Sequence, residues 1–170
     1  MNLPNKLSLL RIILIPLLVY VLLSGLPYSR FIGIAIFVIV ALTDYFDGYI
    51  ARKLDQVTKL GMFLDPLADK LLLISVMLCL VELDLISTIP VMIVVIRDFA
   101  VTGLRLSAAS SGRIIAADRL GKYKAALLDV AVVLLLLEVP GSVTFLWITV
   151  LISVVSGISY FEQNWKVLNG

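Results

Sequence analysis

Five aspartates lie in the segment DYFDGYIARKLDQVTKLGMFLDPLADK, residues 44–70, of a chain that has only 12 acidic residues. Asp44 and Asp47 are three residues apart, and Asp65 and Asp69 are four residues apart. On a helix, each of these spacings places the two carboxylates of a pair on one face. If the helices that carry the two pairs are antiparallel neighbours joined by a short loop, all four carboxylates converge.

Four converging carboxylates next to hydrocarbon need a counter-charge, because they repel one another and are costly to desolvate. One or two hard divalent cations would neutralise them. The chain contains no histidine, so a metal site must be built from oxygen ligands, which suit Mg²⁺, Mn²⁺ or Ca²⁺. The aspartate spacing therefore predicts a metal site.

The alternative is that these aspartates cap helices or pair with neighbouring cations. For Asp55, in the predicted loop 53–62, that interpretation is preferred. Pro66 directly follows Asp65 and is typical of a helix start, so Asp65 is expected to cap a helix as well as to coordinate. Gly48 would let a ligand approach the helix backbone, although a glycine there also suits close helix packing.

The composition indicates an integral membrane protein. The 170 residues are 61% hydrophobic and 15% charged, with a mean hydropathy of +1.10. Soluble domains are about half apolar and about a quarter charged. The N-terminal apolar run is expected to be retained as the first helix, because Arg11 interrupts it and no small-residue cleavage site clearly follows.

The hydrophobic runs predict an all-α bundle of six transmembrane helices forming a single domain over residues 1–170, since each run is close to the roughly 20 residues that cross a bilayer. Turn-forming residues separate them. The predicted spans are 7–26, 31–52, 63–83, 88–109, 121–139 and 143–163.

The distribution of lysine and arginine predicts the orientation. With six spans both termini share one side, and 13 of the 14 cations fall there; Arg30 is the exception. That side is expected to be cytoplasmic, which makes the chain a multi-pass protein of the cell membrane with both termini and the aspartate cluster at the cytoplasmic face.

Several ionisable residues are predicted within the spans. Asp98 and Asp129 are expected to pair with cations, Asp98 with Arg97, Arg105 or Lys122. Arg11 could contact a substrate phosphate or extend to the lipid headgroups, and the second interpretation is slightly favoured.

The aspartate segment carries the pattern Asp-x2-Asp-Gly-x2-Ala-Arg-x8-Gly-x3-Asp-x3-Asp, eight fixed positions within residues 44–69. It resembles, without a departure, the signature of the CDP-alcohol phosphotransferase family. The six-helix topology extends the resemblance over most of the chain. Within the family, the chain is most similar to members that use glycerol 3-phosphate, through the segments NKLSLLRIILIP, LGMFLDPLADK, IRDFAVTGLR and GKYKA.

The resemblance implies a function. Members transfer a phosphatidyl group from a CDP-linked lipid to an alcohol, release CMP and need divalent metal. For this chain the expected substrates are CDP-diacylglycerol and glycerol 3-phosphate, and the expected product is phosphatidylglycerophosphate. A homodimer embedded among membrane lipids is also implied, and no nucleic acid is expected.

The resemblance also implies roles for individual residues. Two Mg²⁺ or Mn²⁺ ions would be held by Asp44, Asp47, Asp65 and Asp69. Asp69 would in addition be the general base, although the sequence does not rank it against Asp65. The CDP moiety would be contacted by Gly48, Arg52 and Thr58.

A second basic group could bind the phosphate of the acceptor. Arg105 is the best candidate, because an unpaired cation within an apolar helix is costly; Arg113, Lys122 and Lys124 come next. The alternative is that these cations reflect orientation and attraction to anionic lipids, at about 1 kcal/mol per residue near the surface.

Three other interpretations remain open. The same chemistry could use another acceptor, namely serine, inositol phosphate or phosphatidylglycerol. Carboxylates in membrane helices also mark ion paths, so a divalent-cation transporter is possible; it would need acidic residues across the bilayer, whereas here they concentrate at one face. A purely structural membrane protein would leave the four aspartates unexplained.

Overall fold

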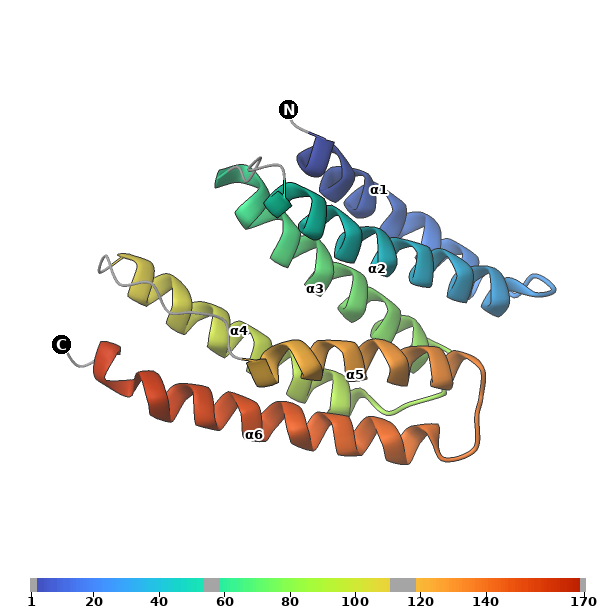
Figure 1. Ribbon diagram of the computed structural model, residues 1–170. Helices are drawn as coiled ribbons and strands as arrows, with labels where there is room; N and C mark the ends of the chain where they lie inside the picture. Colours follow the sequence, from blue (N-terminus) through green and yellow to red (C-terminus); the bar gives the residue numbers. More distant parts are fainter. Residues whose placement is uncertain (1–2, 54–58, 111–118, 169–170) are drawn as a thin grey trace. The chain divides into compact units, whose positions relative to one another are not determined.

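The computed structural model describes residues 3–53, 59–110 and 119–168, with side chains described within 9–43, 65–109 and 123–165. The described residues form six helices and no strand, which confirms the all-α prediction (Figure 1). The helices are α1 (Leu3–Leu23), α2 (Ser29–Lys53), α3 (Lys59–Glu82), α4 (Thr88–Ser110), α5 (Arg119–Leu136) and α6 (Ser142–Leu168).

The helices α3 and α5 end in the same way. At the end of α3, the amide of Leu85 donates to the carbonyl of Leu80 over 2.9 Å, and Asp84 adopts a φ of 57°. The end of α5 repeats this pattern, with Glu138 at a φ of 52°. In both helices the residue after the one with positive φ donates its amide to the carbonyl five residues earlier. This hydrogen bond closes the last helical turn, and the chain then reverses.

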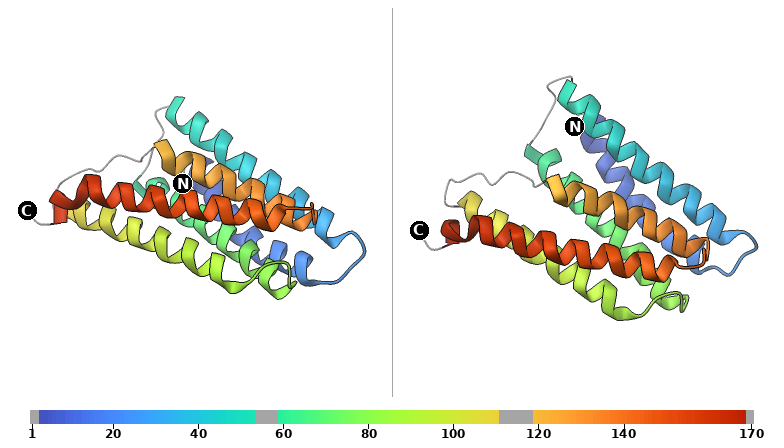
Figure 2. Two further views of the ribbon diagram at one scale, coloured as in Figure 1. Left: turned by 90° about the horizontal axis from the view of Figure 1, so that it is seen from below. Right: turned by 60° about the horizontal axis from the view of Figure 1, so that its bottom comes forward.

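The chain divides into two compact units, residues 1–85 and 86–170. In the first unit, α1 packs against both α2 and α3; in the second, α6 packs against both α4 and α5 (Figures 1 and 2). Consecutive helices run in opposite directions within each unit. As a result, the end of α2 and the start of α3 lie at the end of the first unit where α1 begins.

Each unit has its own apolar core. Leu18, Phe37 and Met77 are fully buried in the first unit, and Leu128 and Leu146 in the second. The burial of such apolar side chains is the main favourable contribution to folding within each unit.

The packing of α1 on α2 depends on a glycine. A Cβ atom at Gly33 would lie 2.3 Å from Cδ2 and 2.9 Å from Cγ of Leu22. Both distances are far shorter than a carbon–carbon contact allows. Gly33 therefore sets how closely these two helices approach.

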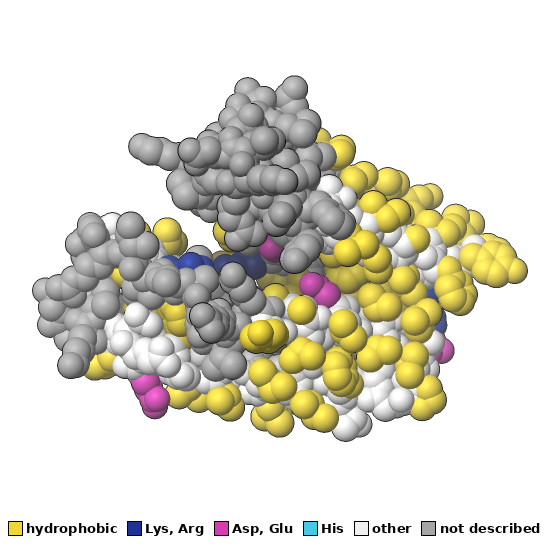
Figure 3. Space-filling model, viewed as in Figure 1, with side chains coloured by type: hydrophobic (Ala, Val, Ile, Leu, Met, Phe, Trp, Pro, Cys, Tyr) yellow, Lys and Arg dark blue, Asp and Glu magenta, His cyan; other side chains and the backbone are white. Residues whose placement is uncertain are grey.

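Large hydrophobic side chains cover most of the described surface on the face shown in Figure 3. Ile13, Phe31, Phe99 and Val155 each expose more than 60% of their area. Soluble monomers rarely expose contiguous apolar patches above a few hundred Å². This surface is that of a membrane-associated protein.

Within the described residues, one helical segment is by itself long and apolar enough to cross a bilayer: Ser142–Trp165 in α6. The apolar helical stretches Leu9–Leu23 and Ser29–Thr43 are shorter. Charged residues interrupt the apolar runs of α3, α4 and α5. The six helices are thus confirmed, whereas six membrane spans stay a prediction.

Candidate functional site

The two aspartate pairs belong to the same unit. Asp44 and Asp47 lie in the last turns of α2, and Asp65 and Asp69 lie in the first half of α3. The five residues 54–58 separate the two helices, so about 20 Å at most can separate the helix ends. The structure therefore brings both helix segments to one end of the unit; the side chains of the α2 pair lie outside its described part.

The α3 pair is described in full. Asp65 and Asp69 are one helical turn apart, with Asp65 half-buried and Asp69 exposed. Both carboxylates take part in polar interactions. Their positions one turn apart on α3 confirm that this pair shares one helical face.

One expectation for this pair is wrong. Asp65 was expected to begin its helix, but α3 begins at Lys59 and Pro66 lies inside it. Asp65 therefore does not cap the helix. Proline cannot donate to the carbonyl four residues earlier, so the helix runs through this position without that hydrogen bond.

The residues expected to contact CDP are only partly within the described structure. Gly48 and Arg52 lie on α2, on the same segment as the first aspartate pair. The side chain of Arg52 is not among those described. Thr58 lies outside the described residues. Among the described side chains, which do not include Asp44 and Asp47, no group of three or more acids or cysteines is positioned to hold a metal ion.

Arg11 on α1 is buried, with an exposed fraction of 3%. It does not extend to the lipid headgroups, so the slightly favoured interpretation of this residue is wrong. The reason is the packing of α1 against both α2 and α3, which turns the Arg11 face of α1 inward. Sequence alone could not show which face that would be.

The basic residues proposed for the acceptor belong to the second unit. Arg105 is exposed near the end of α4, and Lys124 is buried near the start of α5, with an exposed fraction of 4%. Lys122 lies on α5, but its side chain is not described, and Arg113 lies outside the described residues.

The ammonium of Lys124 has a carboxylate partner. It donates a hydrogen bond to Oδ1 of Asp98, which is itself buried. The same oxygen accepts from Nη1 of Arg97 at 3.0 Å. The expected pairing of Asp98 with Arg97 is confirmed. The second partner is Lys124, which was not among the cations expected for Asp98.

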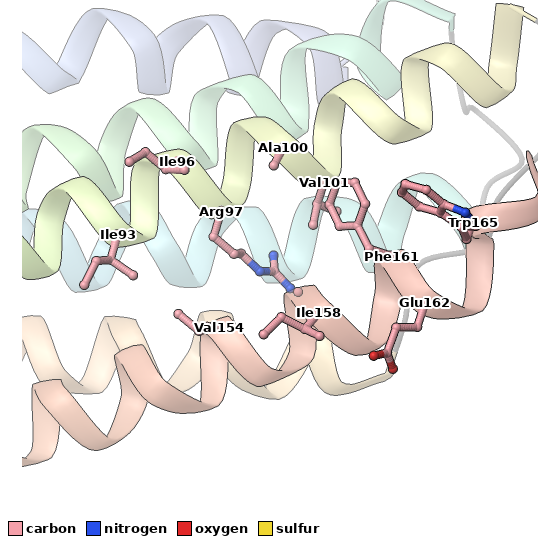
Figure 4. A pocket seen from close by; sticks show the side chains of 11 residues that line it. Ile93, Ile96, Arg97, Ala100, Val101, Val154, Ile158, Phe161, Glu162 and Trp165 are labelled. Atoms are coloured by element: carbon pink, nitrogen blue, oxygen red, sulfur yellow. The ribbon is translucent and has the colours of Figure 1, made fainter. Parts of the chain in front are cut away.

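Arg97 connects this ion pair to α6. Its Nε donates to the carbonyl of Ser153 at 3.1 Å, and its Nη2 donates to the hydroxyl of Ser156 at 3.0 Å. Figure 4 shows the guanidinium of Arg97 extending from α4 toward α6. A Cβ atom at Gly157 would lie 3.0 Å from Cγ of Arg97, so this glycine gives the arginine its room.

A groove of about 530 Å³ runs between α4 and α6 beside Arg97. Apart from Arg97 and Glu162, the side chains around it are apolar (Figure 4). None of the predicted donor, metal or acceptor residues lines it. The groove is therefore not the candidate catalytic site.

Comparison with known proteins identifies the family. A sequence model of the CDP-alcohol phosphatidyltransferases matches residues 1–155, which include both aspartate pairs and all the basic residues discussed above. The chain belongs to the CDP-alcohol phosphatidyltransferase family. The resemblance noted from the aspartate signature is thus confirmed.

Three relatives illustrate how far the similarity extends. The chain is 42% identical to CDP-diacylglycerol–glycerol-3-phosphate 3-phosphatidyltransferase of Bacillus subtilis, over 98% of this chain and 97% of that protein. It is 36% identical to the protein of the same name in Rickettsia felis, over 95% and 94%. It is 30% identical to a plant protein of that name, numbered 2, from Arabidopsis thaliana, over 98% and 81%.

Membership of the CDP-alcohol phosphatidyltransferase family gives the aspartate segment a chemical context. These are membrane enzymes that generally use divalent metals. Oxygen donors without histidine fit a hard cation, and the α3 pair is accessible rather than sealed in the core. The residues present therefore fit a divalent metal site at the α2–α3 end of the first unit.

Proposed function

We propose that this chain transfers the phosphatidyl group of CDP-diacylglycerol to glycerol 3-phosphate. The hydroxyl oxygen of glycerol 3-phosphate forms a bond to the phosphatidyl phosphorus, the bond from that phosphorus to CMP breaks, and CMP leaves. The products are phosphatidylglycerophosphate and CMP. The observation that carries the proposal is the aspartate signature, eight positions without a departure, inside a family match over residues 1–155. The relatives named for this reaction support the choice of acceptor.

The metal site is assigned to both aspartate pairs. Asp44 and Asp47 from α2 and Asp65 and Asp69 from α3 would hold two divalent cations, Mg²⁺ or Mn²⁺. When bound, such cations stabilise negative charge on the pyrophosphate and on the departing CMP. The pairs are on consecutive helices whose ends meet at one end of the unit, which supports a shared site.

The nucleotide is assigned to the same helix ends. Gly48 lies beside Asp47, where the absence of a side chain lets the CDP moiety approach the α2 backbone. Arg52 offers a planar pair of donors to a phosphate. Thr58 adds a hydroxyl from the connection to α3. Donor recognition and metal binding thus fall on one short segment.

Asp69 is assigned as the general base. The hydroxyl of glycerol 3-phosphate is a very weak acid, so its proton must pass to a base as the oxygen attacks phosphorus. The side chain of Asp69 is exposed on α3, where a polar acceptor can reach it.

Replacing Asp69 with asparagine tests this role. Turnover is expected to fall by about 10²- to 10⁴-fold, because general-base catalysis contributes about that much. Turnover is measured as CMP release at Mn²⁺ concentrations that saturate binding. Asp84→Asn is the matched control, since Asp84 is exposed in a left-handed turn that asparagine also adopts. Near-normal turnover of Asp69→Asn with metal bound would remove the assignment.

The acceptor phosphate is assigned to the basic group of the second unit: Arg105, Arg113, Lys122 and Lys124. A phosphate dianion needs several cationic donors to be recognised beside hydrocarbon. Arg105 is exposed on α4 and is available to a soluble ligand. Lys124 is buried and donates to Asp98, so it would contribute its charge from beneath the surface.

Replacing Arg105 with leucine is expected to raise the KM for glycerol 3-phosphate by about tenfold or more, since a charge-assisted hydrogen bond contributes about 1.5–3 kcal/mol. The KM for CDP-diacylglycerol should change little. Steady-state kinetics with each substrate varied in turn measures both constants. Arg105→Lys, which keeps the charge but loses the planar fork, should give a smaller rise. Equal rises in both constants would argue against a role in acceptor binding.

The membrane arrangement completes the proposal. The six spans are predicted from the apolar runs, and the distribution of cations predicts that both termini and the active site lie at the cytoplasmic face of the cell membrane. The chain is further proposed to be a homodimer, as the family resemblance implies. The apolar surface of the described helices and the long apolar segment of α6 support integration into the membrane.

The direct test is an assay of purified protein with CDP-diacylglycerol, Mg²⁺ and one alcohol at a time. The alcohols are glycerol 3-phosphate, serine, inositol phosphate and phosphatidylglycerol. CMP release and a new phospholipid are expected with glycerol 3-phosphate alone, and both should stop when a chelator removes the metal. A product formed with a different alcohol would identify that alcohol as the acceptor in place of glycerol 3-phosphate. No CMP release with any alcohol would overturn the proposed transfer.

A further inference from the structure

The second unit contains a buried ionic network that links its three helices. Lys124 of α5 donates to Asp98 of α4, and Arg97 of α4 donates to the same carboxylate oxygen. Arg97 is in turn held on α6 by the Ser153 carbonyl and the Ser156 hydroxyl. The position of the Lys124 ammonium is therefore fixed, through one carboxylate, by α4 and α6.

The same face of α4 carries the exposed cation assigned to the acceptor. Asp98, Thr102 and Arg105 are at positions i, i+4 and i+7, which align along one stripe of a helix. Asp98 is buried and Arg105 is exposed, so this stripe runs from the core of the unit to its surface. Lys124 contacts this stripe at Asp98, its buried residue.

The ionic network is shielded from solvent. The side chains of Arg97, Asp98 and Lys124 are 13%, 9% and 6% exposed. Electrostatic interactions are stronger in such surroundings than in water. The carboxylate of Asp98 accepts from the ammonium of Lys124 and so restricts where that charge can lie.

We propose that Asp98 is a positioning residue for acceptor recognition: it holds the ammonium of Lys124 beside the α4 stripe, so that Lys124 and Arg105 receive the phosphate of the acceptor together. This inference rests on the proposed transfer to glycerol 3-phosphate. Asp98 itself touches no substrate. Its effect is on where the Lys124 charge lies, and Arg97 keeps Asp98 in place.

The first experiment is Asp98→Asn in the purified full-length protein with CDP-diacylglycerol and saturating Mg²⁺. The amide keeps the shape but loses the charge that holds Lys124. The KM for glycerol 3-phosphate is expected to rise by about tenfold, as for one lost charge-assisted hydrogen bond. The KM for CDP-diacylglycerol and kcat should change less than about twofold. A carboxylate with a merely structural role would instead affect both substrates or the amount of active protein.

A double substitution tests whether Asp98 acts through Lys124. In a Lys124→Gln background, Asp98→Asn should add no further rise in the acceptor KM, because the group it positions has been removed. Asp98→Glu, which keeps the charge, should restore part of the acceptor affinity. If the rise caused by Asp98→Asn were the same with and without Lys124, the inference would be overturned.

Glu162→Gln is the matched control, since Glu162 is an exposed carboxylate on α6 outside the network, and it should leave both KM values unchanged. Should Asp98→Asn not fold, Asp98→Glu takes its place: a selective rise in the acceptor KM that is absent in the Lys124→Gln background supports the inference, and an unchanged acceptor KM overturns it. No CMP release from the unsubstituted protein would remove the proposed function and this inference with it. An active unsubstituted protein with no selective effect in the variants would remove this inference only.

Discussion

The neutralisation of charge in an apolar chain is the constraint on which this structure depends. Each charged side chain placed among hydrocarbon needs a partner close by, because an isolated ion there is costly. The second unit meets this requirement internally, with Asp98 between Arg97 and Lys124 and with α6 completing the hydrogen bonds of Arg97. The first unit concentrates four carboxylates at one end, which external cations would neutralise. The same physical requirement thus accounts for the ionic network in one unit and for the metal site that we propose in the other.

The two units have different chemical characters. The first carries the acidic segment assigned to the metal ions and to CDP, and the second carries the basic residues assigned to the acceptor phosphate. Each assignment matches a different substrate group: carboxylates bind metal ions, which bind pyrophosphate, whereas arginine and lysine bind a phosphate monoester directly. In the proposed assignment, donor recognition and acceptor recognition thus fall on different halves of the sequence.

Much of the fold was predictable from the sequence. The run predicted at 88–109 became α4, Thr88–Ser110, because an uninterrupted apolar stretch between turn residues leaves few alternatives. The spacing of Asp65 and Asp69 was equally informative, since helical periodicity alone places them on one face. The start of α3 was less predictable. Pro66 favours a helix start, yet the helix begins at Lys59, because a proline can be tolerated where the rest of the segment favours a helix.

The partners of buried charges could not be predicted, because they depend on how each helix is rotated about its axis. Lys124 and Asp98 are 26 residues apart, and nothing in their local sequence shows that α5 turns Lys124 toward α4. Arg11 illustrates the same limit: hydropathy showed that it lies in an apolar helix, but not that packing would bury it. Periodicity defines the faces of a helix, and tertiary packing decides which face turns inward.

The central claim is that α2 and α3 contribute to one shared metal site, and Mn²⁺ binding tests it most directly. Purified protein is titrated with Mn²⁺ in the presence of CMP, and free Mn²⁺ is measured by electron paramagnetic resonance. The account predicts two bound ions per chain, with binding weakened by Asp44→Asn on α2 and also by Asp65→Asn on α3. Unchanged Mn²⁺ binding in either variant would contradict a site built from both helices.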